Sequence, residues 1–254
     1  MPTIRSNGLW LHFEQDGDPA WPTVLLVHGF ASSGDDNWLA TGWVKRLHEA
    51  KRRTVRVDCR GHGRSEKPHD PAAYSLDLFA ADLDEVLRYA NARSVDLFGY
   101  SMGARICAFA TVRHPGCVRS LIMGGLGVRL VDGVGLSDDI AQALEADSLD
   151  EVSDPIGRRF RAFAEQTKSD RVALAACLRG SRQTMPLDAA RSIGVPTLIA
   201  VGTRDDVAGP AAPLAAIIPG AQVLDIPGRD HMLAVGDKVF KAGALAFLQS
   251  RSSD

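Results

Sequence analysis

Short apolar runs alternate with longer segments of helical periodicity along most of this chain. Each run is rich in Val, Leu and Ile and is bounded by Gly, Pro or Asp, which is typical of strands buried on both faces. Such strands in alternation with helices predict an α/β fold with a doubly wound, mostly parallel sheet. The expected strands cover residues 23–27, 54–57, 94–98, 118–123, 196–201 and 221–226.

Segments with helical periodicity fill the intervals between these strands. Residues 8–13, ahead of them, alternate apolar and polar side chains, which predicts an antiparallel edge strand before the parallel core. The expected helices cover residues 37–50, 76–91, 102–114, 210–217 and 235–249, the last made less regular by Gly243.

Residues 130–188 break the alternation, because they show helical patterning without a strand-like run. We interpret them as a small helical cap inserted into a single domain of residues 1–254, since single α/β domains of about 200 to 250 residues are common. Open α/β sheets bind ligands at the carboxyl ends of their strands, so a cap there would shape a substrate pocket. The alternative interpretation is that residues 130–188 only cover one end of the sheet and shape no pocket.

Composition limits the possible partners. With a formal net charge of -2, the chain lacks the basic field that binds nucleic acid or anionic membranes. It contains neither a continuous apolar stretch of membrane-spanning length nor an evident signal peptide, which indicates a cytoplasmic protein. Its four cysteines are widely spaced, so we expect free thiols and no metal site. These features predict no particular oligomeric state.

One segment carries a candidate nucleophile. The run SVDLFGYSMGARICAFA passes from an apolar strand, through a G-x-S-x-G pattern centred on Ser101, into a helix. This context is typical of a nucleophile elbow. The serine occupies a sharp, strained turn, so Gly99 and Gly103 are needed to keep neighbouring backbones from colliding. The helix that follows favours negative charge developing at Ser101.

A second segment, VLLVHGF, ends the first core strand with His28, Gly29 and Phe30. A loop in this position supplies one backbone amide to an oxyanion hole, here that of Phe30. The amide of Met102, directly after the nucleophile, supplies the other. For His28 we expect a structural role, hydrogen-bonding the loop.

The candidate base is His231, in the segment GRDHM between the last strand and the final helix. Its acid should end the preceding strand, because this fold presents serine, acid and histidine in that order. The segment GTRDD offers two carboxylates there. We prefer Asp205, with Asp206 as the alternative, since adjacent residues in a turn cannot both face one imidazole. Asp206 would then cap the following helix.

With these residues placed, the chain resembles the α/β-hydrolase superfamily and, within it, small serine carboxylesterases. The segments HGF, VDCRGHGRSEKP, GYSMG, GTRDD and GRDHM carry the resemblance. It implies the α/β-hydrolase fold with a small helical cap, and a tight structural turn at residues 58–65. Dehalogenases and epoxide hydrolases use an aspartate as nucleophile, where this chain has Ser101.

The predicted function is hydrolysis of a small-molecule carboxylic ester through an acyl-enzyme on Ser101, with His231 as base and Asp205 orienting it. This chemistry needs no cofactor. One alternative is an enol-lactonase or carbon-carbon bond hydrolase with the same triad. Another, from a different class, is a ligand-binding receptor on a hydrolase scaffold.

A basic anchor for a substrate carboxylate would favour the lactonase or carbon-carbon hydrolase. The clustered candidates are Arg158, Arg159 and Arg161 of the cap, which would otherwise form a solvated helix face. Three aromatic residues would either line the pocket or pack in the core: Trp38, Phe160 and Phe163.

Overall fold

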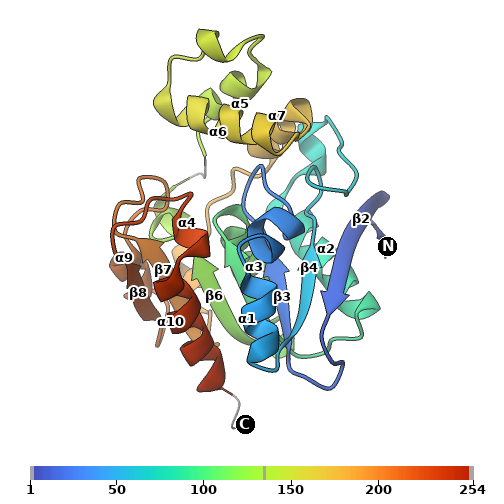
Figure 1. Cartoon of the computed structure of the whole chain (residues 1–254), viewed down its shortest axis with the longest axis vertical. Helices are drawn as coiled ribbons and strands as arrows, with labels where there is room; N and C mark the ends of the chain where they lie inside the picture. Colours follow the sequence, from blue (N-terminus) through green and yellow to red (C-terminus); the bar gives the residue numbers. More distant parts are fainter. Residues whose placement is uncertain (1–2, 134–135, 252–254) are drawn as a thin grey trace.

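The computed structural model describes residues 3–133 and 136–251 and confirms the α/β fold class. An eight-stranded sheet lies at its centre (Figure 1). All the strands expected from the apolar runs are present. The strands are β1 (Thr3–Ser6), β2 (Leu9–Asp16), β3 (Thr23–Val27), β4 (Arg53–Val57), β5 (Val95–Tyr100), β6 (Val118–Gly124), β7 (Thr197–Gly202) and β8 (Gln222–Ile226).

The strand order is β1-β2-β4-β3-β5-β6-β7-β8. From β4 to β8 the neighbours pair in parallel, whereas β2 pairs antiparallel with both β1 and β4. The antiparallel strand predicted near the N-terminus is therefore confirmed, but its position at the edge is wrong because β1 lies outside it. β1 has only four residues, two of them buried, so its periodicity is too short to detect in the sequence.

Helices cover both faces of the sheet. Along β3, Leu25 and Val27 belong to the core cluster shared with the helices behind the sheet, while Val24 and Leu26 pack with Trp43 and other residues in front (Figure 1). This alternation explains why β3 is apolar at every position from Val24 to Val27. The covering helices are α1 (Trp43–Glu49), α2 (Leu76–Tyr89), α3 (Met102–Arg113), α9 (Ala211–Ala215) and α10 (Lys238–Gln249), with short turns at η2 (Pro71–Ala73) and η3 (Pro115–Cys117).

Two of the expected helices differ from prediction. The segment 37–50 is broken at Gly42, whose φ of 81° separates the turn η1 (Asp35–Leu39) from α1. The final segment begins with the turn η5 (Ala234–Gly236), and α10 then runs unbroken through Gly243. A Cβ at Gly243 would lie 2.5 Å from a methyl carbon of Leu224, so this glycine lets α10 approach β8 closely rather than disrupting it.

The described residues of the segment between β6 and β7 form helices joined by loops and include no strand. Figure 1 shows α5, α6 and α7 grouped beyond one end of the sheet, whereas α8 returns to pack on α3. The interpretation of residues 130–188 as a cap inserted into a single domain remains a prediction. The elements are α4 (Arg129–Asp132), α5 (Asp138–Glu145), η4 (Leu149–Glu151), α6 (Pro155–Gln166), α7 (Arg171–Gly180) and α8 (Leu187–Arg191).

Two searches of the described residues bear on possible partners. None of the helices in residues 3–133 and 136–251 has the length and apolarity needed to cross a membrane. Within the same residues, no three or more His, Cys, Asp and Glu side chains are grouped as metal ligands.

Candidate active site

Ser101 lies in a strained turn between β5 and α3. Its φ and ψ are 53° and -111°, outside the regions that side-chain-bearing residues ordinarily adopt. A Cβ at Gly99 would lie 2.2 Å from the carbonyl oxygen of Gly103, and a Cβ at Gly103 would lie 2.0 Å from that of Val27. Both glycines are therefore required sterically, as the sequence pattern predicted.

A chain of hydrogen bonds joins Ser101, His231 and Asp205. The Ser101 Oγ lies 2.9 Å from His231 Nε2, and His231 Nδ1 lies 2.8 Å from Asp205 Oδ2. The carboxylate at Nδ1 selects the tautomer with its proton on that nitrogen, so Nε2 accepts from the Ser101 hydroxyl. The structure thus brings together three residues that are far apart in the sequence and that come from three different loops.

Asp205 is the carboxylate that meets His231, and its environment stabilises the charged form. The side chain is fully buried, and its second oxygen accepts hydrogen bonds from the Val207 and Ala208 amides at 2.9 Å each. Burial acts to raise the pKa of Asp205, but the bonds from His231 and the two amides outweigh it, so this pKa is lowered. Asp206 is exposed instead and pairs with Arg159 at 2.8 Å.

The loop after β3 runs beside Ser101. A Cβ at Gly29 would lie 3.6 Å from that of Ser101, and the Gly29 amide is held by Asn37 Oδ1 at 2.9 Å. Among the described residues, no acceptor pairs with the backbone amide of Phe30 or of Met102. Two unpaired donors beside a serine hydroxyl suit an oxyanion.

His28 holds this loop in place. Its Nδ1 donates to the Gly29 carbonyl at 2.8 Å, and its Nε2 accepts from the Cys59 amide at 3.0 Å. The ring is completely buried, and burial lowers the pKa of His28, which keeps it neutral. This geometry agrees with the structural role predicted for it.

Sequence reasoning missed Tyr100, the residue before the serine. Its buried hydroxyl donates to the His231 carbonyl at 2.6 Å, so the elbow itself anchors the loop that carries the imidazole. Burial raises the pKa of Tyr100, with Asp205 and Asp230 contributing, so the phenol remains a donor. Its signal was its place within GYSMG, but no local pattern points to a carbonyl 131 residues away.

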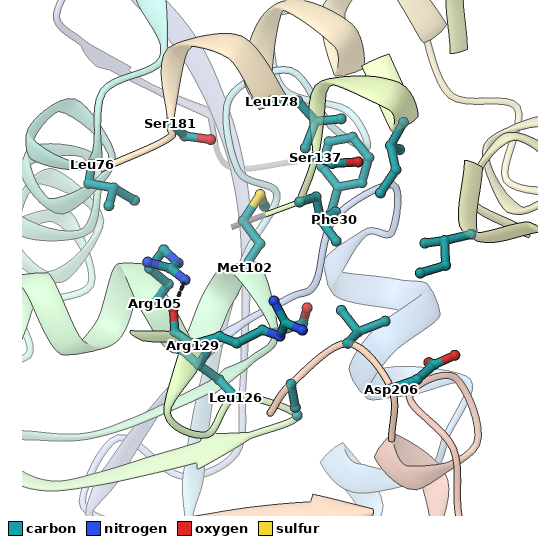
Figure 2. Close-up of a pocket in the computed structure, with 17 residues that line it drawn as sticks. Phe30, Leu76, Met102, Arg105, Leu126, Arg129, Ser137, Leu178, Ser181 and Asp206 are labelled. Atoms are coloured by element: carbon teal, nitrogen blue, oxygen red, sulfur yellow. Dashed lines mark hydrogen bonds between the residues drawn. The ribbon is translucent and has the colours of Figure 1, made fainter. Parts of the chain in front are cut away.

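Two cavities meet at Ser101 and Phe30. The first, which we call the Arg129 cavity, measures about 200 Å³; Figure 2 shows it, with Met102, Arg105 and Arg129 among its labelled side chains. The second, the His231 cavity, measures about 210 Å³. Its lining includes His231, Tyr100, Asn37, Phe160 and Phe163.

The three arginines proposed as a basic anchor do not line either cavity. Arg158 and Arg161 donate to backbone carbonyls within residues 143–152, and Arg159 pairs with Asp206. Of the aromatic candidates, Trp38 is completely buried beside Trp43 and Phe98 and belongs to the core. Phe160 and Phe163 of α6 do line the His231 cavity.

Comparison with known proteins shows which proteins this chain resembles. The family of the α/β hydrolase fold matches residues 22–126, which include Phe30 and Ser101. Epoxide hydrolase 4 of Mus musculus is 31% identical over 122 residues, which cover 47% of this chain and 32% of that protein. The chain therefore matches only about a third of the length of that curated relative.

Two further similarities extend over most of the chain. The 2-(acetamidomethylene)succinate hydrolase of Mesorhizobium japonicum is 27% identical over 234 residues, covering 83% of this chain and 81% of that protein. The crystal structure of the enol-lactonase from Burkholderia xenovorans LB400 superposes with a TM-score of 0.79 at 21% identity, covering 98% of this chain and 100% of that one. The superposition shows that this chain has the α/β-hydrolase fold, and its residues 22–126 match the family of that fold.

Proposed function

We propose that this protein is a serine hydrolase that cleaves a small carboxylic ester through an acyl-enzyme intermediate. The observation that carries the proposal is the hydrogen-bonded chain from Ser101 through His231 to Asp205. A serine hydroxyl is a weak nucleophile, and a neutral imidazole within hydrogen-bond reach activates it by taking its proton. Epoxide hydrolases use an aspartate as nucleophile, whereas this chain has Ser101 at that place in the pattern.

In the proposed mechanism, Ser101 Oγ attacks the ester carbonyl while His231 Nε2 takes the hydroxyl proton. The charge that develops on the carbonyl oxygen is bound by the amides of Phe30 and Met102. Asp205 holds the imidazole in the required tautomer and stabilises its cation. His231 then protonates the leaving alcohol, and it later activates the water that releases the acid.

The experiment measures hydrolysis of p-nitrophenyl esters from acetate to octanoate by the wild-type protein and by Ser101→Ala. We expect kcat to fall by roughly 10⁴-fold or more in the variant, since removing a nucleophile of this type abolishes acyl transfer. Ser192→Ala is the matched control, because it removes an identical hydroxyl from an exposed residue that lines neither cavity, and it should leave turnover nearly unchanged. Equal turnover by the wild type and Ser101→Ala would contradict the proposal.

The alternative functions predicted from the sequence would give different results in assays with lactones and with p-nitrophenyl esters. A lactone is a cyclic ester, so the same residues would open it, and preference for lactones over p-nitrophenyl esters would favour an enol-lactonase. A carbon-carbon bond hydrolase would cleave neither class. A receptor on this scaffold would give at most one slow turnover with the product retained.

A further inference from the structure

Two guanidinium groups face the Arg129 cavity, one from Arg105 on α3 and one from Arg129 on α4. The one acidic side chain in the described lining is Asp206, and Arg159, which lies outside the lining, already pairs with it. Even if Asp206 is counted as a full negative charge, the described lining has two positive side chains and one negative side chain. The remaining wall is largely apolar, with leucine and isoleucine side chains from the core and from the cap.

Arg105 is occupied by the backbone. Its guanidinium donates to the carbonyls of Leu130 at 3.3 Å, Gly133 at 3.2 Å and Gln183 at 3.1 Å, and also to the carbonyl of Arg129 (Figure 2). These carbonyls lie on both segments that join the cap to the core. Burial lowers the pKa of Arg105 to about 10, so it stays charged at neutral pH. Its role is to fix this backbone, including that of Arg129.

The Arg129 side chain has a fixed stem and a free head. A Cβ at Gly133 would lie 3.1 Å from Arg129 Cβ, and a Cβ at Gly209 would lie 3.0 Å from its Cγ, so the stem packs against both glycines. Figure 2 shows the side chain extending into the cavity, toward the region below Met102. Among the described residues, no hydrogen bond or ion pair engages its guanidinium. A cation without a counterion among the described residues, in a cavity that the candidate nucleophile also lines, suits a negatively charged ligand.

We propose that the Arg129 cavity receives the acyl part of an ester that carries a carboxylate at its far end, and that Arg129 binds this carboxylate. This inference rests on the proposed function. Arg105 is a positioning residue for Arg129, since it binds the Arg129 carbonyl. The leaving alcohol occupies the His231 cavity, because His231 must protonate it. His231 lines this cavity and does not line the Arg129 cavity. One free guanidinium matches the single charge of a carboxylate better than a phosphate monoester, which carries nearly two.

The test compares two 4-nitrophenyl esters that differ only at the far end of the acyl chain: 4-nitrophenyl hydrogen adipate ends in a carboxylate, and 4-nitrophenyl methyl adipate ends in a neutral methyl ester. The adipoyl chain is long enough that its own carboxylate does not readily attack the ester carbonyl. We expect the wild type to favour the charged ester by about 10- to 100-fold in kcat/KM, the range of one charge-assisted hydrogen bond. Arg129→Gln should lose this preference, because its kcat/KM should fall far more for 4-nitrophenyl hydrogen adipate than for 4-nitrophenyl methyl adipate.

Arg182→Gln is the matched control. It removes the same charge next to the lining residue Ser181, but Arg182 does not itself line the cavity. We expect this variant to keep the preference for the charged ester. Equal kcat/KM for the two esters in the wild type, or an unchanged preference in Arg129→Gln, would overturn the inference.

Binding to a catalytically silent protein separates this inference from the proposed function. In the Ser101→Ala background, calorimetry should show the hydrogen adipate ester binding about 10-fold or more tightly with Arg129 than with glutamine at that position. That result without turnover by the wild type would sustain the carboxylate site and refute only the ester hydrolysis. Serine-dependent turnover of neutral esters without Arg129-dependent binding would refute only the carboxylate site.

Discussion

Replacing Gly103 with alanine places a methyl group where the structure has no room for one. The new Cβ would lie 2.0 Å from the Val27 carbonyl oxygen, 2.5 Å from the Val27 carbonyl carbon and 2.6 Å from the His28 carbonyl oxygen. All three atoms are backbone, at the point where β3 leads into the loop that carries Phe30. No side-chain rotation can relieve these contacts, so α3 and the loop must separate.

The size of this separation sets the expected effect. Real Cβ atoms do not approach other atoms closer than 3.0 Å, so the 2.0 Å contact requires a shift of at least about 1 Å. Overpacking of this kind lowers the free energy of unfolding by about 1–3 kcal/mol. The same shift moves Ser101 and the Met102 amide relative to the Phe30 amide, and a displacement of about 1 Å costs on the order of 10²-fold in rate.

Urea unfolding and p-nitrophenyl ester turnover measure the two effects. Gly116→Ala is the matched control, because nothing lies within 4 Å of a Cβ at Gly116, and this substitution should leave both measurements nearly unchanged. We expect Gly103→Ala to lower the urea midpoint and to reduce kcat/KM by roughly 10²-fold. Wild-type stability together with wild-type turnover in Gly103→Ala would refute the steric account of the elbow.

Two further predictions concern the carboxylates. Asp205→Asn should lower kcat by about 10⁴-fold, as loss of the orienting acid does in serine hydrolases. Asp206→Asn should change kcat by less than about fivefold, because a surface ion pair contributes little. A larger loss of kcat in Asp206→Asn than in Asp205→Asn would reverse the assignment of the acid. The pKa of Asp205 is lower in the folded protein than the unfolded value of about 3.9. The charged carboxylate therefore stabilises the fold at pH values above about 3.9. This stabilisation is lost as the pH falls through the folded-state pKa. In urea titrations, the destabilisation by Asp205→Asn should therefore shrink as pH is lowered from 6 toward 3, and a constant difference would contradict the argument.

The sequence was most informative where the constraint is local. The steric demand of a strained turn is met within five residues, so Gly99 and Gly103 identify the position of Ser101 without any knowledge of the rest of the chain. Apolar runs buried on both faces likewise locate the parallel strands. By contrast, β1 was missed because four residues with two buried positions carry too little periodicity.

The charged residues of the site were the hardest to predict. Arg158, Arg159 and Arg161 attract attention as a cluster, yet the structure engages them with cap carbonyls, Asp206 and Glu165. In the sequence, Arg105 and Arg129 each stand alone among mostly apolar residues, and in the structure both line the cavity. Spacing along a helix does not tell which side of it will meet a cavity built by other segments.

The sequence by itself determined the fold class, the strands of the parallel core, the position of the strained turn at Ser101 and the chain order of Ser101, Asp205 and His231. Each of these follows from periodicity, from local sterics or from the connectivity of the sheet. Only the tertiary structure decided that Asp205 rather than Asp206 reaches His231, and that Arg129 lines the cavity with no partner for its guanidinium among the described residues. Those outcomes depend on contacts between residues far apart in the chain, and such contacts exist only once the sheet, the loops at its carboxyl end and the helices above them have packed together.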